Sequence, residues 1–457
     1  MRGGERRRAS RARAGARARA GAGVGKAGGC VGGGVGIGAV FVGAGLPWAR
    51  LRAVSAGLGV VLLGLGVGAE RAAAQLAVRG GTVYTMAGAP ITDGVVLIGR
   101  DGRIERVGAA SDVDIPDGYR VLEGEVVTPG LIDAHTVVGL AGYLNQEQDQ
   151  DQLEQSNAIQ PELRAFDAYN ARERLIEWVR GFGVTTLHTG HGPGALMSGQ
   201  TMVVKTRGNN VGEAIVDSVA MVAMTLGPEV SQNFESPGTR AKGVAMIRAA
   251  FIKAREYARK RAAAEDGSGP ERDLKLEILA RVLDGEVPAL ITAQKVSEIL
   301  AALRLQQEFG FRLVLDGAAE SYLVTDEIRA AGVPVILHPT MARQRGTLEN
   351  ATLETAKILH EAGIPVALQS GYEGYVPKTR VVLFEAAMAA AYGLPFEAAL
   401  ATVTIDAARI LGIADRVGSL EEGKDGDVAI FDGDPFEYTS HVCGVVIEGA
   451  VVSEQCR

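Results

Sequence analysis

The sequence of 457 residues is poor in cysteine and in aromatic residues, and it lacks the common nucleotide-binding and serine-hydrolase motifs. Aromatic side chains make up 5% of the chain and apolar residues 47%, so the core must draw mainly on alanine, valine and leucine. A core of this composition is typical of α/β proteins. No phosphate-binding loop, dinucleotide fingerprint or Gly-x-Ser-x-Gly elbow occurs, which excludes those sites from the sequence.

The net charge of −7 averages two unlike parts of the chain. Residues 1–74 carry 12 Lys and Arg against 2 Asp and Glu, whereas the rest carries 35 against 52. The acidic part lacks the excess of cationic side chains that contacts with phosphates require. We therefore expect no nucleic-acid partner.

The end of the basic segment has the order of a secretory signal peptide. Arg50 and Arg52 precede an uncharged apolar run over 53–69, and small residues at 72–74 come directly before Gln75. This order of charged, apolar and small residues is that of an export signal. We expect residues 1–74 to be a low-complexity leader and signal peptide, and the mature protein to be periplasmic or extracellular.

A membrane anchor is the alternative interpretation of the same apolar run. A spanning helix needs ~20 apolar residues, and the run over 53–69 is shorter and rich in glycine. No other segment is long and apolar enough to span a bilayer. We therefore expect no stable membrane span after cleavage.

Two of the 3 cysteines lie in the mature chain. Cys443 and Cys456 flank a predicted hairpin formed by residues 445–447 and 450–452. A disulfide between them would suit an oxidising compartment. Two free thiols near the C-terminus are the alternative, and the sequence leaves both open.

Short β-type runs separated by Gly and Asp turns lie at both ends of the mature chain. They occupy residues 76–84, 94–98, 104–107, 426–432 and 445–452. The simplest arrangement is one small β-sandwich domain built from both ends, over residues 75–126 and 413–457.

Between these ends, short apolar runs alternate with helical patterns. The runs cover residues 126–132, 184–188, 202–205, 219–224, 289–292, 312–315, 333–337 and 365–368. Such an alternation is typical of parallel α/β folds. We predict an α/β chain with a TIM-type (β/α)8 barrel over residues 127–412.

Two motifs at opposite ends of the mature chain resemble those of the amidohydrolase superfamily. The sequence Val-Thr-Pro-Gly-Leu-Ile-Asp-Ala-His at 127–135 is similar to the first barrel strand of that family. Residues 404–412 and 418–432 are similar to its last helix and its return into the β-domain. Gly-Val-Thr-Thr at 183–186 and the segment 199–205 resemble the imidazolonepropionase-like branch.

The resemblance implies metal-assisted hydrolysis of carbon–nitrogen bonds, with a metal that activates water and polarises a carbonyl group. His135 matches the first histidine of the family's ligand pair, but the second position is Val137. The fifth-strand and sixth-strand histidines should fall near Thr292 and Gly317, and the eighth-strand aspartate near Gly371. The resemblance therefore implies a degenerate metal centre.

Two further histidines follow the second predicted strand. His188 and His191 should lie beside His135, and three imidazoles could hold one Zn²⁺. The alternative is two ordinary histidines in a glycine-rich loop, so the cofactor is one zinc ion or none. Asp316, next to the expected sixth-strand position, is the one neighbour that could replace a ligand.

Four polar residues are expected to bind substrate at the mouth of the barrel. Lys205 lies on a strand-like run, and His338 ends the seventh strand. Gln369 and Tyr372 flank the position of the missing aspartate. Side chains at the carboxyl ends of barrel strands are those that usually contact substrate.

The sequence leaves two functions open. The first is an exported hydrolase that acts on non-peptide carbon–nitrogen bonds, with most of the metal ligands replaced. The second is a catalytically inactive, small-molecule-binding pseudoenzyme on the same barrel. The sequence names no substrate and leaves room for a homo-oligomer.

Overall fold

The computed structural model describes residues 75–457 except 145, 266–267, 339, 341–343 and 373–381. All of the described residues belong to one compact unit, Gly68–Arg457. The predicted leader, residues 1–74, lies outside them.

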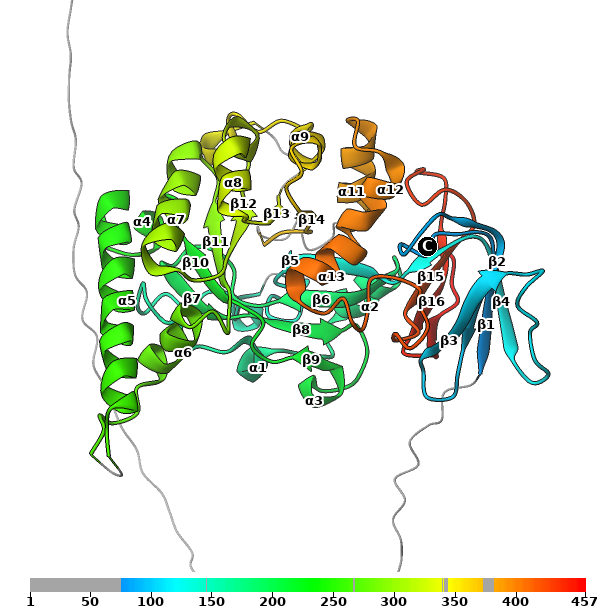
Figure 1. Ribbon diagram of the computed structural model, residues 1–457, viewed down its shortest axis with the longest axis horizontal. Helices are drawn as coiled ribbons and strands as arrows, with labels where there is room; N and C mark the ends of the chain where they lie inside the picture. Colours follow the sequence, from blue (N-terminus) through cyan, green and yellow to red (C-terminus); the bar gives the residue numbers. More distant parts are fainter. Residues whose placement is uncertain (1–74, 145, 266–267, 339, 341–343, 373–381) are drawn as a thin grey trace, which may run out of the picture. The chain divides into compact units, whose positions relative to one another are not determined.

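Strands from both ends of the described chain form one seven-stranded sheet with the order β17-β16-β15-β4-β1-β2-β3 (Figure 1). Its strands are β1 (Leu76–Val83), β2 (Ile91–Ile98), β3 (Ile104–Ala109), β4 (Arg120–Pro129), β15 (Val428–Phe431), β16 (Val442–Ile447) and β17 (Ala450–Ser453). β1 pairs with β4 in parallel, and β15 joins β4 in the antiparallel direction. The strands from the N-terminal segment and those from the C-terminal segment therefore meet where β4 pairs with β15.

The predicted sandwich is a single continuous sheet that curls over itself. The amide of Gly426 donates to the carbonyl of Gly102 at 2.8 Å, and the amide of Gly449 donates to Gly426 at 3.1 Å. These bonds bring the β2–β3 turn close to the β16–β17 turn, although the two turns belong to opposite edges of the sheet. One apolar cluster accordingly takes side chains from both halves, among them Val78 and Val446.

The middle of the chain forms two further sheets. One has the order β14-β13-β12-β11-β10-β7 and the other the order β5-β6-β8-β9. Their strands are β5 (Leu131–Thr136), β6 (Val184–Thr189), β7 (Met197–Gln200), β8 (Met202–Lys205), β9 (Ile215–Asp217), β10 (Val222–Thr225), β11 (Ala289–Ala293), β12 (Leu313–Gly317), β13 (Val335–Leu337) and β14 (Val366–Leu368). Strands β10 to β14 are parallel to one another, as are β5 and β6. β7 pairs with β10, and β8 with β6 and β9, in the antiparallel direction.

The described strands thus form a mixed α/β arrangement of separate sheets, whereas the sequence predicted a single closed barrel. A parallel bridge between Thr136 and Gly371 joins the end of β5 to the segment after β14. Strands of both sheets also enclose one central apolar cluster. Its members include Ile132, Val203, Leu290, Val314, Ile336 and Ala367.

Helices alternate with these strands along the chain (Figure 1). They are α1 (Ala165–Ala168), α2 (Arg174–Arg180), α3 (Val211–Ala214), α4 (Glu229–Asn233), α5 (Arg240–Ala262), α6 (Leu274–Leu283), α7 (Val296–Phe309), α8 (Thr325–Ala331), α9 (Thr355–Glu361), α11 (Val382–Ala391), α12 (Phe396–Thr402) and α13 (Ile405–Leu411). α6 begins where Asp273 accepts the amides of Lys275 and Leu276, and α7 ends at Gly310, whose φ of 79° suits glycine. Within the described residues, no helix combines the length and apolarity that crossing a membrane would require.

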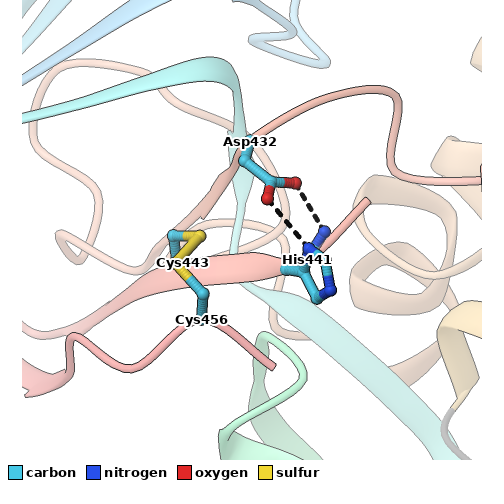
Figure 2. The surroundings of a disulfide bond; sticks show 4 residues. All are labelled: Asp432, His441, Cys443 and Cys456. Carbon is cyan, nitrogen blue, oxygen red and sulfur yellow. Dashed lines mark hydrogen bonds and ion pairs between the residues drawn. A yellow bond between two sulfur atoms is a disulfide. The ribbon is translucent and has the colours of Figure 1, made fainter. Parts of the chain in front are cut away.

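A disulfide joins Cys443 of β16 to Cys456 (Figure 2). Beside it, Val442 and Arg457 exchange two backbone hydrogen bonds, at 2.9 and 3.1 Å. Of the two alternatives that the sequence left open, the structure has the cross-linked form, which holds the C-terminal residues against β16.

Candidate functional site

The candidate site lies directly above the central apolar cluster, at the carboxyl ends of the strands. Residues two positions apart on a strand share one face, so the residue two positions after a member of the cluster lies on the same face as that member. The pairs are Leu290 and Thr292, Val314 and Asp316, Ile336 and His338, and Ala367 and Gln369. In each pair the first residue is apolar and the second is a buried polar residue.

Asp316 is the hub of this site. Its Oδ1 lies 2.8 Å from His135 Nδ1 and accepts from Gln369 Nε2 at 2.7 Å. Its Oδ2 accepts from the hydroxyl of Thr292 at 2.5 Å. Burial alone would raise the pKa of Asp316, but the charge and hydrogen bond of His135, with the bonds from Thr292 and Gln369, lower it below its usual value. We conclude that Asp316 is a buried carboxylate.

The tautomer of His135 follows from this hub. Because the Asp316 carboxylate can only accept, His135 Nδ1 carries the hydrogen of the shared bond. The other ring nitrogen, Nε2, is buried and has no hydrogen-bond partner in the described part of the chain. In the neutral ring, Nε2 therefore presents a lone pair inside the site.

His188 packs against His135 with ring centroids 5.5 Å apart. Its Nδ1 lies 2.6 Å from the carbonyl oxygen of Ala134, and its Nε2 lies 2.6 Å from Thr201 Oγ1. Burial, reinforced by the charge of His135, lowers the pKa of His188 to about 3. His188 is thus a neutral imidazole whose two nitrogens both have partners within the protein.

His191 lies close to Gly199, and its environment differs. A Cβ on Gly199 would lie 2.4 Å from His191 Cδ2, so only glycine leaves room for this ring. Neither ring nitrogen has a hydrogen-bond partner among the residues that the structure describes, although the side chain is buried. Burial lowers the pKa of His191 to about 4, which keeps the ring neutral at pH 7.

These three histidines do not fit a metal centre as they are placed. Over the described residues, no group of three or more His, Cys, Asp or Glu side chains could hold a metal ion. A metal at His188 Nε2 would have to displace the hydroxyl of Thr201. The zinc site therefore remains a prediction, and we derive no chemical step from it.

The structure brings three of the four predicted substrate-binding residues to the site. The ring of Tyr372 lies 5.7 Å from that of His135 and 5.6 Å from that of His338. Gln369 contacts Asp316, as described above. All three residues stand at or just beyond the ends of β13 and β14.

Gln294 belongs to the same site, although no pattern in the sequence indicated it. Its Nε2 donates to Tyr372 Oη at 3.3 Å, and its Oε1 accepts the amide of Ala319 at 3.1 Å. A Cβ on Gly317 would lie 2.4 Å from Gln294 Nε2, so glycine at 317 makes room for this amide. The position expected to carry a metal ligand thus admits a neutral side chain from the neighbouring strand.

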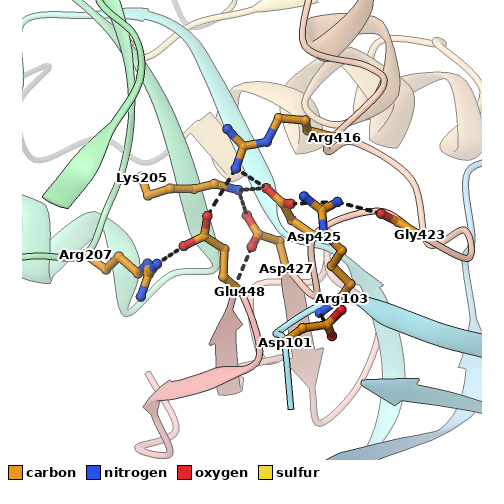
Figure 3. Close-up of polar contacts among 9 residues, drawn as sticks. All are labelled: Asp101, Arg103, Lys205, Arg207, Arg416, Gly423, Asp425, Asp427 and Glu448. Carbon is orange, nitrogen blue, oxygen red and sulfur yellow. Dashed lines mark hydrogen bonds and ion pairs between the residues drawn. The ribbon is translucent and has the colours of Figure 1, made fainter. Parts of the chain in front are cut away.

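Lys205 does not lie at the mouth of the predicted barrel, where the sequence placed it. It lies near the amino end of β6, whereas the site lies at the carboxyl ends of the strands. It pairs with Thr186, near the start of β6, since β8 runs antiparallel to β6. Its Nζ lies 2.6 Å from Asp427 Oδ2 and 3.2 Å from Asp425 Oδ2, and all three side chains are almost fully buried (Figure 3). Lys205 therefore forms an ion pair with the C-terminal segment and does not face the mouth, where substrate was expected.

Asp133 lies two residues before His135 and is also buried. Its carboxylate accepts from the amide of Ser370 at 2.9 Å and from the hydroxyl of the same residue. Burial raises the pKa of Asp133 to about 6, although both bonds from Ser370 oppose that shift. These bonds tie β5 to the segment after β14, so Asp133 holds together two segments that carry residues of the site.

Three comparisons with known proteins each find similarity to amidohydrolases. The model of the amidohydrolase family matches residues 292–453. The crystal structure of an amidohydrolase from Thermotoga maritima MSB8 is 30% identical, aligns with 83% of this chain and 100% of its own, and has a TM-score of 0.78. An imidazolonepropionase from Mesorhizobium japonicum is 27% identical over 381 residues, which are 76% of this chain and 88% of that protein.

A longer relative also matches. Amidohydrolase tasK from Hapsidospora irregularis is 26% identical over 358 residues, which are 72% of this chain. The chain spans only 36% of the length of that relative.

Proposed function

The chain belongs to the amidohydrolase superfamily, on its imidazolonepropionase-like branch, and from this premise we propose that it hydrolyses a non-peptide carbon–nitrogen bond of a small molecule. We assign the role of general base to His135, oriented by Asp316. The observation that carries this assignment is the buried His135–Asp316 pair, in which Nδ1 is engaged at 2.8 Å and Nε2 is left without a partner in the described residues.

The geometry supports base catalysis for a definite reason. The Asp316 carboxylate fixes the hydrogen on Nδ1, orients the ring and stabilises the imidazolium that forms when Nε2 takes a proton. A positioned base of this kind contributes about 10²- to 10⁴-fold to a rate. Thr292 and Gln369 hold the carboxylate in place from its other sides.

The proposed reaction converts an amide and water into a carboxylic acid and an amine. His135 Nε2 removes a proton from water as the water oxygen bonds to the carbonyl carbon, and the C=O electron pair moves onto the carbonyl oxygen. When this intermediate collapses, the C–N bond breaks and the proton held on Nε2 passes to the leaving nitrogen. Tyr372, next to the His135 ring, is the donor that we assign to the carbonyl oxygen.

In this family a bound metal usually supplies water activation and carbonyl polarisation. Among the described residues, no three metal-ligating side chains are grouped so that they could hold a metal ion. The reaction that we propose therefore includes no step on a metal. We propose that His135, Asp316, Gln369 and Tyr372 take over part of that work. The alternative of a non-catalytic binding protein gains no support from the relatives.

We also propose the finer architecture and the location. The central cluster shared by both sheets and the Thr136–Gly371 bridge support a (β/α)8 barrel over 127–412, with the curled sheet over 75–126 and 413–457 as a second domain.

The Cys443–Cys456 disulfide supports an exported protein, because such bonds persist in oxidising compartments. N-terminal sequencing of the secreted protein should begin near Gln75, and an intact Met1 on an intracellular protein would refute export.

The function is tested by hydrolysis assays on lactams, ureides and carboxamides, with metal analysis of the same preparation. We expect turnover of at least one class, and a loss of about 10²- to 10⁴-fold in His135→Gln. His441→Gln is a matched control, because His441 forms a similar pair with Asp432 at 2.9 Å on the surface (Figure 2). That control should retain full activity.

Two results would count against this proposal. A protein that is inert toward all of these compounds would refute the hydrolase. Stoichiometric zinc that is required for turnover, and that is lost in a His135→Ala/His188→Ala double variant, would instead establish the predicted metal site and overturn the assignment of His135 as the base.

A further inference from the structure

The orientation of the Gln369 carboxamide is fixed by its surroundings. Its Nε2 donates to Asp316 Oδ1 at 2.7 Å and to the carbonyl oxygen of Ile336 at 3.1 Å. Both of these partners can only accept, so both amide hydrogens are used. A flipped amide would place Oε1 against two acceptors, which would repel it. Oε1 must therefore be the end that faces away from Asp316.

This oxygen lacks a partner. Gln369 is fully buried, and its Oε1 has no hydrogen-bond partner within the described part of the chain. Buried acceptors are almost always satisfied in folded proteins, because an unpaired one is unfavourable. An acceptor that the fold orients so firmly and leaves unpaired indicates a donor that arrives with a ligand.

The position of Gln369 links this oxygen to the reacting groups. Gln369, directly after β14, and His135, on β5, both engage the same oxygen, Oδ1 of Asp316. His135 Nε2 is likewise buried without a partner among the described residues. The site thus presents two acceptors held by one carboxylate, which suits one hydrogen from water and one from the substrate.

We infer that Gln369 is a specificity-determining residue, whose Oε1 accepts a hydrogen bond from an N–H group of the substrate. This inference rests on the proposed function, since it concerns the same site. It assigns the substrate to amides, lactams or ureides that carry hydrogen on nitrogen. An ester oxygen would face Oε1 with a lone pair, and an N-alkyl group would leave Oε1 unpaired, so both should be rejected.

The test compares matched pairs of small probes for binding to the wild-type protein. The pairs are 2-pyrrolidinone, imidazolidin-2-one and hydantoin, each with the counterpart in which every N–H is replaced by N–CH3, titrated by ligand-observed NMR. We expect at least one N–H member to bind about tenfold or more tightly than its N-methyl partner, in line with one hydrogen bond. If no N–H member binds more tightly than its partner, the inference is wrong. An ordered water that satisfies Oε1 permanently would give that negative result.

A variant locates the effect. In Gln369→Met, which keeps the length of the side chain, the preference for N–H should fall to within about twofold of unity. Gln160→Met removes another buried glutamine, whose amide bonds to the loop carbonyls of Glu154 and Asn157, and should leave the preference unchanged. If Gln369→Met retains the full preference, Gln369 is not the residue that reads the N–H group. If that variant does not fold, the wild-type comparison still decides whether the site selects N–H.

The two proposals fail in different ways. N–H selectivity in binding without any hydrolysis would retain the role of Gln369 and remove the proposed reaction. Hydrolysis with equal binding and turnover of N–H and N-methyl substrates would retain the reaction and remove the role of Gln369.

Discussion

His135 Nδ1 and Asp316 Oδ1 lie 2.8 Å apart although the two residues are 181 positions apart in the sequence. Both side chains are almost completely buried, with exposed fractions of 1% and 0%. β5 and β12 belong to different sheets, so this pair is a contact between the two halves of the central part. The folded arrangement of both sheets is therefore required before the site exists.

Replacing Asp316 with asparagine should reduce turnover more than substrate binding. The new side chain would offer an amide in place of a carboxylate, so it could no longer stabilise the imidazolium or dictate the tautomer of His135. We expect kcat on the best substrate of the hydrolysis assay to fall by about 10²- to 10⁴-fold, with a much smaller change in KM. Asp432→Asn, at the surface pair with His441, is the control. Equal kcat in Asp316→Asn and wild type would contradict the proposed role.

Replacing Lys205 with methionine should destabilise the protein strongly. The substitution would leave Asp427 buried without its cation, whereas Asp425 would keep Arg416, 2.8 Å away. Burial, followed by the charge of Asp425, already raises the pKa of Asp427 despite Lys205. Breaking a buried pair from one side costs about 3–5 kcal/mol. Urea unfolding should show a loss of this size in the free energy of unfolding.

The control for Lys205 is an exposed pair of the same kind. Arg79 and Asp93 lie 2.9 Å apart on the surface, and Arg79→Met should change the free energy of unfolding by less than about 1 kcal/mol. Similar losses in both variants would show that burial of the Lys205 pair adds nothing.

The sequence indicated part of this site, and the reasons for success and failure differ by residue. His135 was identified because a local motif carries it. His338 was identified because it follows an apolar run, and strand ends of parallel sheets gather at one edge. Gln369 and Tyr372 were identified because they flank the position where the family resemblance places an aspartate. Lys205 was misplaced because the antiparallel direction of β8 depends on pairing with β6, which no local pattern encodes.

Gln294 and the role of Asp316 were missed for a related reason. Gln294 reaches the site only because Gly317 on the neighbouring strand leaves room for its amide, and a single sequence does not show which strands are neighbours. The sequence offered Asp316 only as a replacement metal ligand. A register of two residues from each buried apolar position would have placed its side chain in the site, since Val314 precedes it on the same face.

Removing the disulfide should lower stability without abolishing activity. Cys443 and Cys456 are 13 positions apart, and cross-linking a loop of this length stabilises a fold by about 3 kcal/mol through the unfolded chain. We expect a Cys443→Ser/Cys456→Ser variant to lose about this amount in urea unfolding, and wild type to lose the same amount under reductant. The double variant should not respond to reductant. A reductant effect in that variant would show that the change has another origin.

Stability should decrease as the pH falls from 6.5 toward 4, because of His188 and His191. Burial, with the charge of His135 at His188, lowers their pKa values from 6.5 to about 3 and about 4, so in this range the unfolded chain binds protons that the folded chain does not. Asp133 opposes this below about pH 6, since burial raises its pKa to about 6 and the folded state holds that proton. Between pH 4 and 6 the balance is about one proton, or about 1.4 kcal/mol per pH unit.

Two variants resolve the contributions to this slope. His191→Gln should reduce the slope of unfolding free energy against pH by about one proton, to near zero, whereas Asp133→Asn should increase it to about two protons. His360→Gln alters an exposed histidine and should leave the slope as in wild type. Urea unfolding at half-unit steps of pH measures all four proteins, and identical slopes in His191→Gln and wild type would show that His191 is not held neutral by burial.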